Sequence, residues 1–175
     1  MIGTVNPAAP PFQPFLIEHR AAVLRLLVGM VGPSDADDCF QDAFCRALRA
    51  WPPAETGERL GAWMLTIAHR TALDHLRRRS RGDVPTAELA EPVAPPAPPS
   101  SVLARDSAPA ELWAAVRDLP DKQRAAVVLR IVLDKSHAQV ATLLDCSEAA
   151  ARRSYADGLA ALRVQVDAGR LEVTR

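Results

Sequence analysis

The chain has 175 residues, of which 49% are hydrophobic and 24% charged; this is an ordinary globular composition and excludes a fully disordered chain. Basic and acidic residues number 21 each, so the formal net charge is zero and bulk charge gives no indication of a nucleic-acid partner. No apolar run approaches the ~18 residues that cross a bilayer, and residues 1–14 lack the basic residues of a secretory signal, so we expect a cytoplasmic protein.

Two helices open the chain. Apolar residues at helical spacing predict the first over about Phe15–Val31, and Gly32-Pro33 ends it. Ser34 is expected to cap the second, which Trp51-Pro52 ends. Its apolar face consists of Ala36, Phe40, Ala43, Phe44, Ala47, Leu48 and Trp51. Its other face carries Asp38, Gln41, Asp42, Cys45, Arg46 and Arg49. This polar face is either a protein-docking surface or an ordinary solvated surface.

A third helix over about Leu60–Arg79 leads into the most basic stretch of the chain. Between residues 66 and 81, five arginines stand against Asp74 alone, a local charge of +4. One helical stripe holds Trp63, Thr66, Arg70, Asp74 and Arg77. Arginines bind phosphates and an aromatic ring can stack on a base, so the stripe suits a nucleic-acid strand. A core tryptophan beside a solvated basic helix end would explain the same pattern.

A proline-rich segment divides the chain. Seven of the fifteen prolines lie between residues 82 and 110, where repeated proline forbids a helix interior and favours an extended linker. The formal charge is +2 for residues 1–81, −3 for the linker and +1 for the remainder. The zero total is therefore a cancellation between segments of different charge.

The second half is predicted to form four short helices. The first covers Glu111–Leu119, Pro120 breaks it, and Asp121 is expected to cap the next, which runs through Val132. Ser136 and Gln139 form a capping box for a helix to Leu144, and Ser147 opens the last helix. Between these two helices, Asp145 occupies a turn position that favours a left-handed backbone. Two capped helices joined by a tight turn form a helix-turn-helix pattern.

We therefore predict an all-α fold of two small helical domains joined by a flexible linker. The expected segments are a flexible N-terminal segment 1–14, a three-helix domain 15–81, the linker 82–110, a helix-turn-helix domain 111–163 and a C-terminal tail 164–175.

The sequence contains no recognisable catalytic or metal-binding motif. The three cysteines form no CxxC pair and the four histidines have no metal-site spacing. We find no nucleophile paired with a general base, no phosphate-binding loop and no pair of carboxylates spaced for general acid–base catalysis. We expect a protein that is not an enzyme and that takes no cofactor and no metal.

Three stretches, in order, resemble bacterial sigma factors. The run from Asp38 to Phe44, followed by Arg46-Ala47-Leu48 and Trp51, resembles the region-two helix of these proteins. The run from Trp63 to Ala68, with Ala72-Leu73-Asp74 and Arg77-Arg78, resembles the promoter-melting helix that follows it. A third set of residues resembles region four: Leu119-Pro120, Gln123-Arg124, Leu129-Arg130, Ser136, Val140-Ala141, Leu144 and Ser147-Glu148. The length and the missing region three are similar to the extracytoplasmic-function (ECF) group.

The resemblance implies a promoter-specificity subunit of RNA polymerase. It implies that the second helix docks on the clamp coiled coil of core polymerase and that region four binds the polymerase flap. It implies promoter DNA as a partner, with region two holding the melted −10 strand and region four reading the −35 duplex. It further implies an anti-sigma protein as a partner.

Site residues follow from the same resemblance. The expected polymerase-binding residues are Asp38, Gln41, Asp42 and Arg46. The expected −10 residues are Trp63, Thr66, Arg70, Asp74, Arg77 and Arg78. The expected −35 residues are Ser147, Glu148, Ala150, Arg152 and Arg153.

Two other interpretations remain open on the residues alone. One is a helix-turn-helix regulator that acts on DNA without polymerase, and the other is a helical adaptor that binds no DNA. The stretch from Trp63 to Arg81 discriminates between them and a sigma factor, because a regulator of duplex DNA has no need of a helix for melted strand.

Overall fold

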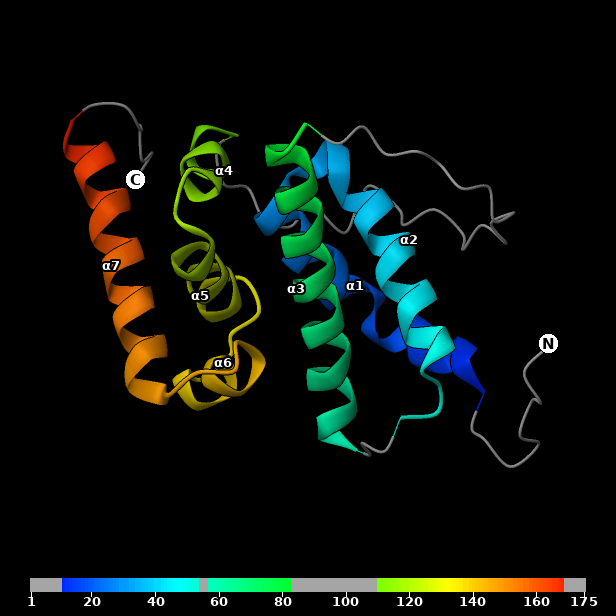
Figure 1. Cartoon of the computed structure of the whole chain (residues 1–175). Helices are drawn as coiled ribbons and strands as arrows, with labels where there is room; N and C mark the ends of the chain where they lie inside the picture. The colour runs from blue at the N-terminus through cyan, green and yellow to red at the C-terminus, as the bar shows by residue number, and fades with distance from the viewer. Residues whose placement is uncertain (1–10, 54–56, 83–109, 169–175) are drawn as a thin grey trace.

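The computed structural model describes residues 11–53, 57–82 and 110–168, and its regular structure there is helical throughout (Figure 1). Residues 83–109 of the expected linker, residues 1–10 of the expected N-terminal segment and residues 169–175 of the expected C-terminal tail lie outside the described residues.

Three helices form the N-terminal unit: α1 (Phe12–Val31), α2 (Pro33–Arg49) and α3 (Glu58–Ser80). The expected apolar face of α2 is buried at Ala36, Phe40, Ala43, Phe44 and Ala47. Leu48 and Trp51 are exceptions, because Leu48 is 54% exposed at the end of the helix and Trp51 is half-buried.

Helix α1 begins three residues earlier than the sequence indicated. The Phe12 ring packs 5.6 Å from that of Phe15 and 5.2 Å from that of Trp51, between ring centroids. This burial stabilises an extra turn that propensity alone would not predict. Residues 12–14, expected in a flexible segment, therefore belong to the helix.

The start of α2 corrects the expected Ser34 cap. Gly32, with φ of 91°, holds the N-cap position, Pro33 is the first helical residue and Ser34 lies inside the helix. Proline favours the first helical position because its φ is already helical and its missing N–H is not needed there. Glycine before it supplies the left-handed backbone of the sharp α1–α2 corner.

Four helices form the C-terminal unit: α4 (Ala110–Arg117), α5 (Asp121–Ile131), α6 (His137–Leu143) and α7 (Glu148–Asp167). Asp121 is not the cap of α5, because Pro120 holds that position and no side chain caps the helix. Helix α7 continues to Asp167, so residues 164–167 belong to it and not to a tail.

The helix-turn-helix forms as the sequence predicts. The Gln139 amide N–H donates to the Ser136 hydroxyl (3.2 Å), and the Ser136 N–H donates to the Gln139 side chain (2.9 Å). Asp145 in the turn has φ of 51°. The Ser147 hydroxyl accepts from the Ala150 N–H (3.2 Å) and begins α7.

The two units pack against each other through one continuous core. Buried side chains of α1 and α3 join those of α5 and α6 in a single cluster. In Figure 1, α5 and α6 lie beside α1 and α3, while α2 and α7 lie on opposite outer sides. The sequence predicted the two units but not this contact between them.

Candidate nucleic-acid interface

An ion-pair network joins the polar face of α2 to the basic end of α3. Arg46 donates to both carboxylate oxygens of Asp42 (3.0 and 3.2 Å) and to Asp74 (2.8 Å). These bonds, led by that to Asp74, raise the pKa of the Arg46 guanidinium above its ordinary value. Pairs that are about one-third exposed or more, like these, contribute only about 0–1 kcal/mol each. The network therefore acts mainly to orient side chains.

A second pair of contacts fixes the last turns of α3. Asp35 accepts from Arg79 (2.5 Å) and lies 3.1 Å from His75 Nε2. The acidic start of α2 thus neutralises part of the arginine cluster at the end of α3. Of the residues expected to bind the −10 strand, Arg70, Arg77 and Arg78 are exposed, with the Arg77 side chain at 66%.

The aromatic member of the α3 stripe is half-buried. The Trp63 ring lies 5.9 Å from Phe15 and 6.4 Å from Trp51, between centroids. Thr66, one turn on, donates its hydroxyl to the Ala62 carbonyl (3.0 Å). Trp63 therefore packs against the core, as the alternative interpretation held, and its side chain is still partly exposed.

The expected site residues of α3 divide into two groups. Arg70, Arg77 and Arg78 are exposed cations, whereas Asp74 lies between two arginines, 2.8 Å from Arg46 and 3.9 Å from Arg77. The stripe therefore brings positive charge to one surface and holds it against acids of α2. The other half of the α3 surface, with Ala62 and Leu65, faces α6.

The first turns of α7 carry the other expected DNA residues on an exposed surface. Arg152 donates to Glu148 (2.6 and 3.2 Å), and Arg153, which is 85% exposed, lies 3.8 Å from Asp157. Ala150 is exposed and Ala151 is buried. An exposed helix N-terminus with two arginines fits the phosphates beside a DNA groove.

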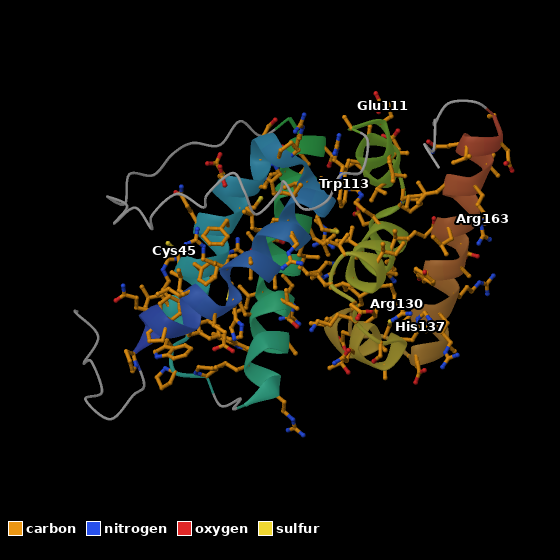
Figure 2. All side chains as sticks on the ribbon, turned by 180° about the vertical axis from the view of Figure 1, so that it is seen from behind. Cys45, Glu111, Trp113, Arg130, His137 and Arg163 are labelled. Carbon is orange, nitrogen blue, oxygen red and sulfur yellow. The ribbon has the colours of Figure 1, made fainter. Side chains whose placement is uncertain are left out.

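Behind α7, an aromatic contact secures the helix-turn-helix. The Arg130 guanidinium lies 5.6 Å over the Tyr155 ring and donates to the Lys135 carbonyl. The His137 ring packs edge-on against Tyr155 at 5.5 Å (Figure 2 labels Arg130 and His137). These contacts hold α6 and α7 to α5 and so fix the angle of the exposed helix.

Arg124, named above only as part of the resemblance to region four, makes a contact between the units that the sequence reasoning missed. It is 8% exposed, and it donates across the two units to the Met30 carbonyl (2.8 Å) and within its own unit to the Leu119 carbonyl (3.0 Å). Burial lowers the pKa of its guanidinium. An arginine in the apolar run of α5 was the available signal.

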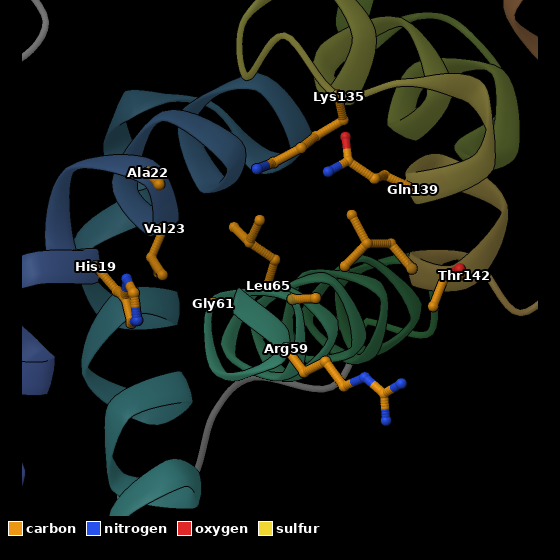
Figure 3. A pocket seen from close by; sticks show the side chains of 11 residues that line it. His19, Ala22, Val23, Arg59, Gly61, Leu65, Lys135, Gln139 and Thr142 are labelled. Atoms are coloured by element: carbon orange, nitrogen blue, oxygen red, sulfur yellow. The ribbon is translucent and has the colours of Figure 1, made fainter. Parts of the chain in front are cut away.

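A cleft of about 550 Å³ opens between the two units (Figure 3). His19, Val23 and Gly61 line it from α1 and α3, and Lys135, Gln139 and Thr142 line it from the opposite side. Within the part of the chain that the structure describes, no group of three His, Cys, Asp or Glu side chains could hold a metal ion. Nor does any helix described there have the length and apolarity to cross a membrane.

Comparison with known proteins finds the same two regions in the same order. Residues 16–82 match sigma-70 region 2 and residues 110–162 match sigma-70 region 4. The chain is 31% identical over 172 residues to the RNA polymerase sigma factor CarQ of Myxococcus xanthus, covering 96% of each chain. It is 30% identical over 146 residues to the RNA polymerase sigma-H factor of Pseudomonas aeruginosa, covering 77% of this chain and 75% of the relative.

The fold is shared with a solved structure as well. The sigma factor RpoE in complex with the anti-sigma factor NepR from Bartonella quintana superposes with a TM-score of 0.67. The match covers 89% of this chain and 96% of that one, at 19% identity.

Proposed function

The chain belongs to the ECF group of sigma factors, with regions 2 and 4 of the sigma-70 family, and directs promoter recognition by RNA polymerase; from this premise we propose which of its surfaces meet polymerase and which meet DNA. Its family is not enzymatic. The observation that carries the assignment of surfaces is the exposed basic stripe of α3, which lies inside the match to sigma-70 region 2.

Run-off transcription tests the function as a whole. Purified chain is mixed with core polymerase and genomic DNA fragments, and the transcript starts are mapped. We expect starts at a small set of promoters that core polymerase alone does not use. Failure of the chain to bind core polymerase, with any inhibitor removed, would contradict the proposal.

The exposed face of α2 is the proposed docking surface for the clamp coiled coil of core polymerase. Asp38 and Gln41 are exposed, and Asp42 and Arg46, which are half-buried, flank them. Because Asp42 and Arg46 are bonded to each other, their replacement would also disturb α3. Asp38 and Gln41 therefore report on docking alone.

The double substitution Asp38→Ala with Gln41→Ala tests this surface. We expect the Kd for core polymerase to rise at least about tenfold, which is 1.4 kcal/mol, with an unchanged far-ultraviolet circular dichroism spectrum. Glu111→Ala is the matched control, because it removes one exposed carboxylate from α4, in the other unit. Equal affinities for all three proteins would show that the α2 face is only solvated surface.

The α3 stripe is the proposed surface for the melted −10 strand. Arg70, Arg77 and Arg78 are exposed cations that suit phosphates, and Trp63 on the same stripe is partly exposed. Asp74, bonded to Arg46, is proposed to position Arg46 and Arg77 at this surface rather than to contact DNA.

Salt dependence tests the arginines. Removing one arginine–phosphate contact to a single strand lowers the slope of log K against log salt by about 0.7. Arg70→Ala with Arg77→Ala should therefore flatten the slope for the holoenzyme on a promoter by about 1.4. Arg163→Ala, on the outer part of α7 (Figure 2), removes an exposed cation elsewhere and should leave the slope unchanged. An unchanged slope in the double variant would remove both arginines from the site.

The exposed start of α7 is the proposed −35 surface. Ser147 caps the helix, and the small side chains of Ala149 and Ala150 leave room for DNA to approach it closely. Of the two arginines, Arg152 and Arg153, the second is the more exposed. Glu148 holds Arg152 along the helix. Small side chains and tethered arginines favour readout through phosphates and DNA shape over a dense set of base contacts.

An anti-sigma protein is the remaining proposed partner. The support is the shared fold of the Bartonella quintana sigma factor, which was solved bound to such a protein. Co-expression with candidate inhibitors followed by run-off transcription tests it, with loss of the specific transcript as the expected result.

A further inference from the structure

The cleft between the two units has the size of a small-molecule site. Its volume of about 550 Å³ falls within the roughly 300–1,000 Å³ of ligand pockets. Helices α1 and α3 supply one wall, and α6 with the turn before it supplies the other (Figure 3). Eleven residues line it, well below the roughly 20–30 that a stable protein interface uses on each side. A small ligand therefore fits the cleft better than a second protein.

Apolar side chains from both units form the floor of the cleft. Val23 of α1, Leu65 of α3 and Leu143 of α6 line it and are themselves buried. Ala22 and Gly61 line it beside them and leave space, because they carry a methyl group and no side chain. A floor of this kind favours a ligand with a hydrocarbon body, since binding removes apolar surface from water.

The charged groups at the rim are cations. Lys135 and Arg59 line the cleft, and neither forms an ion pair or a side-chain hydrogen bond with another described residue. In Figure 3 the Lys135 side chain extends over the cleft toward Ala22 and Val23, whereas the Arg59 guanidinium points outward. No Asp or Glu is among the described residues that line the cleft. Lys135 is therefore an unpaired cation above an apolar floor.

Two further rim groups are hydrogen-bond donors. The Gln139 side-chain oxygen accepts from the Ser136 N–H (2.9 Å), which leaves the amide N–H groups free toward the cleft. Across the cleft, burial and, less strongly, the charge of Lys135 lower the pKa of His19, against an opposing effect of Glu18. The imidazole is therefore neutral at neutral pH and offers one N–H. The charge of Lys135 acts across the cleft.

The turn that carries Lys135 is fixed by its own hydrogen bonds. The Lys135 N–H donates to the Leu129 carbonyl (2.9 Å), and the Lys135 carbonyl accepts from the Arg130 guanidinium. Asp134, the residue before it, has a left-handed backbone with φ of 49°. The capping box fixes Gln139 in the same way. Because these donors are already in place, a ligand loses little affinity to their ordering.

We propose that the cleft is a binding site for a small amphiphilic anion. Lys135 and the Gln139 amide hold its carboxylate or phosphate group, and the floor of Val23, Leu65 and Leu143 holds a short hydrocarbon body. The site goes beyond the proposed function, because none of the residues assigned above to polymerase or to DNA lines it. A ligand bound there touches both units, so it should raise the melting temperature of the full chain.

Calorimetric titration of the full chain tests the site with four probes: octanoate, octyl phosphate, octanol and inorganic phosphate. We expect one of the two amphiphilic anions, or both, to bind once per chain. Octanol and inorganic phosphate should bind at least about tenfold more weakly, because each lacks one of the two interactions. The tighter of the two anions identifies the head group. Octanol binding as tightly as octanoate and octyl phosphate would overturn the proposal, and so would inorganic phosphate doing so.

Lys135→Met tests the cation, because methionine keeps an apolar stem and removes the charge. The Kd of the anionic probe should rise at least about tenfold, and that of octanol should change less than about twofold. Lys122→Met is the matched control, because it removes the only other lysine of the chain. Lys122 is exposed at the start of α5 and does not line the cleft, so the Kd should be unchanged.

Gly61→Leu tests the floor. A Cβ atom at Gly61 would lie 3.5 Å from the His19 ring, an ordinary contact, and leucine favours a helix more than glycine does. The variant should keep α3, fill part of the cleft and abolish the rise in melting temperature that the anionic probe gives the parent. No binding by the parent, or equal affinity in the parent and in Lys135→Met, would overturn the site. None of these measurements uses polymerase or promoter DNA, so their failure leaves the proposed function standing, and failed run-off transcription leaves the site standing.

Discussion

The pKa of His69 depends on the packing of the two units. It lies on α3, and burial lowers its pKa to about 4, against a smaller opposing effect of Asp121 at the start of α5 and with a further lowering by Arg70. The imidazole is therefore neutral in the folded chain at neutral pH. Its ordinary pKa of about 6.5 returns when the site is exposed.

This difference in pKa predicts a loss of stability in mild acid. The contribution is fully present above about pH 6.5 and is lost as the pH falls toward 4, because only the unfolded chain binds the proton in that range. Between about pH 7.5 and 5 the free energy of unfolding should fall by about 2 kcal/mol from this group.

Urea unfolding of the parent and of His69→Gln at about pH 7.5, 6 and 5 measures this change. The variant stays neutral throughout, so the difference between the two proteins cancels the titration of the carboxylates and of His19, whose pKa burial also lowers. A difference that does not change with pH would show that His69 is not buried against region 4.

The residue scale is also where prediction from sequence was least complete. Exposed residues of the α2 and α7 surfaces followed from periodicity, because a helix places every third or fourth side chain on one face. The pairing of Arg46 with Asp74 did not follow, since residues 28 apart meet only through the packing of two helices. The bond of Arg124 to the Met30 carbonyl was missed for the same reason, because the two residues lie 94 positions apart.

At the scale of elements, local signals predicted the helix-turn-helix closely. The capping box at Ser136, the left-handed Asp145 and the Ser147 cap were all readable within a few residues. The errors were also local in their cause. We expected polar side chains to cap α2 and α5, but Gly32 and Pro120 occupy these N-cap positions. Helix α1 begins earlier than expected because the Phe12 ring packs on Trp51, a contact that local sequence rules do not contain.

The capping box should contribute measurably to stability. Helix α6 has seven residues and is too short to form without support. Ser136→Ala removes the acceptor for the Gln139 N–H and should lower the free energy of unfolding by about 1 kcal/mol. Thermal and urea unfolding of the full chain measure the change.

Thr142→Ala is a fair control for that substitution. Its exposed hydroxyl donates to the Ala138 carbonyl within the same helix (3.1 Å), a bond that a helix does not need. We expect an effect within about 0.5 kcal/mol. A Ser136 variant no less stable than this control would show that the box is not formed in solution.

At the scale of the whole molecule, the distribution of charge and proline predicted the division into segments but not their arrangement. The proline-rich stretch marked where the chain divides, and each half showed its own helices. Whether two small domains pack on each other depends on shape at a few positions. Here the two units approach closely at Gly29, where a Cβ atom would lie 2.7 Å from a Val128 methyl, and no local sequence signal contains such a contact.

One shared core predicts one unfolding transition. Each unit is small, and the two units share one cluster of buried side chains, so the contact between them should couple their unfolding. Calorimetry of the parent chain should therefore give a single peak whose calorimetric and van't Hoff enthalpies agree. Gly29→Gln should separate this peak into two, at lower temperatures, because each unit then unfolds by itself. Gly158→Ala, which places a methyl against Val127 inside the C-terminal unit, should lower the temperature of a single peak, since the contact between the units is intact. Two peaks in the parent would mean that the two units unfold independently and that the contact between them is too weak to couple their unfolding.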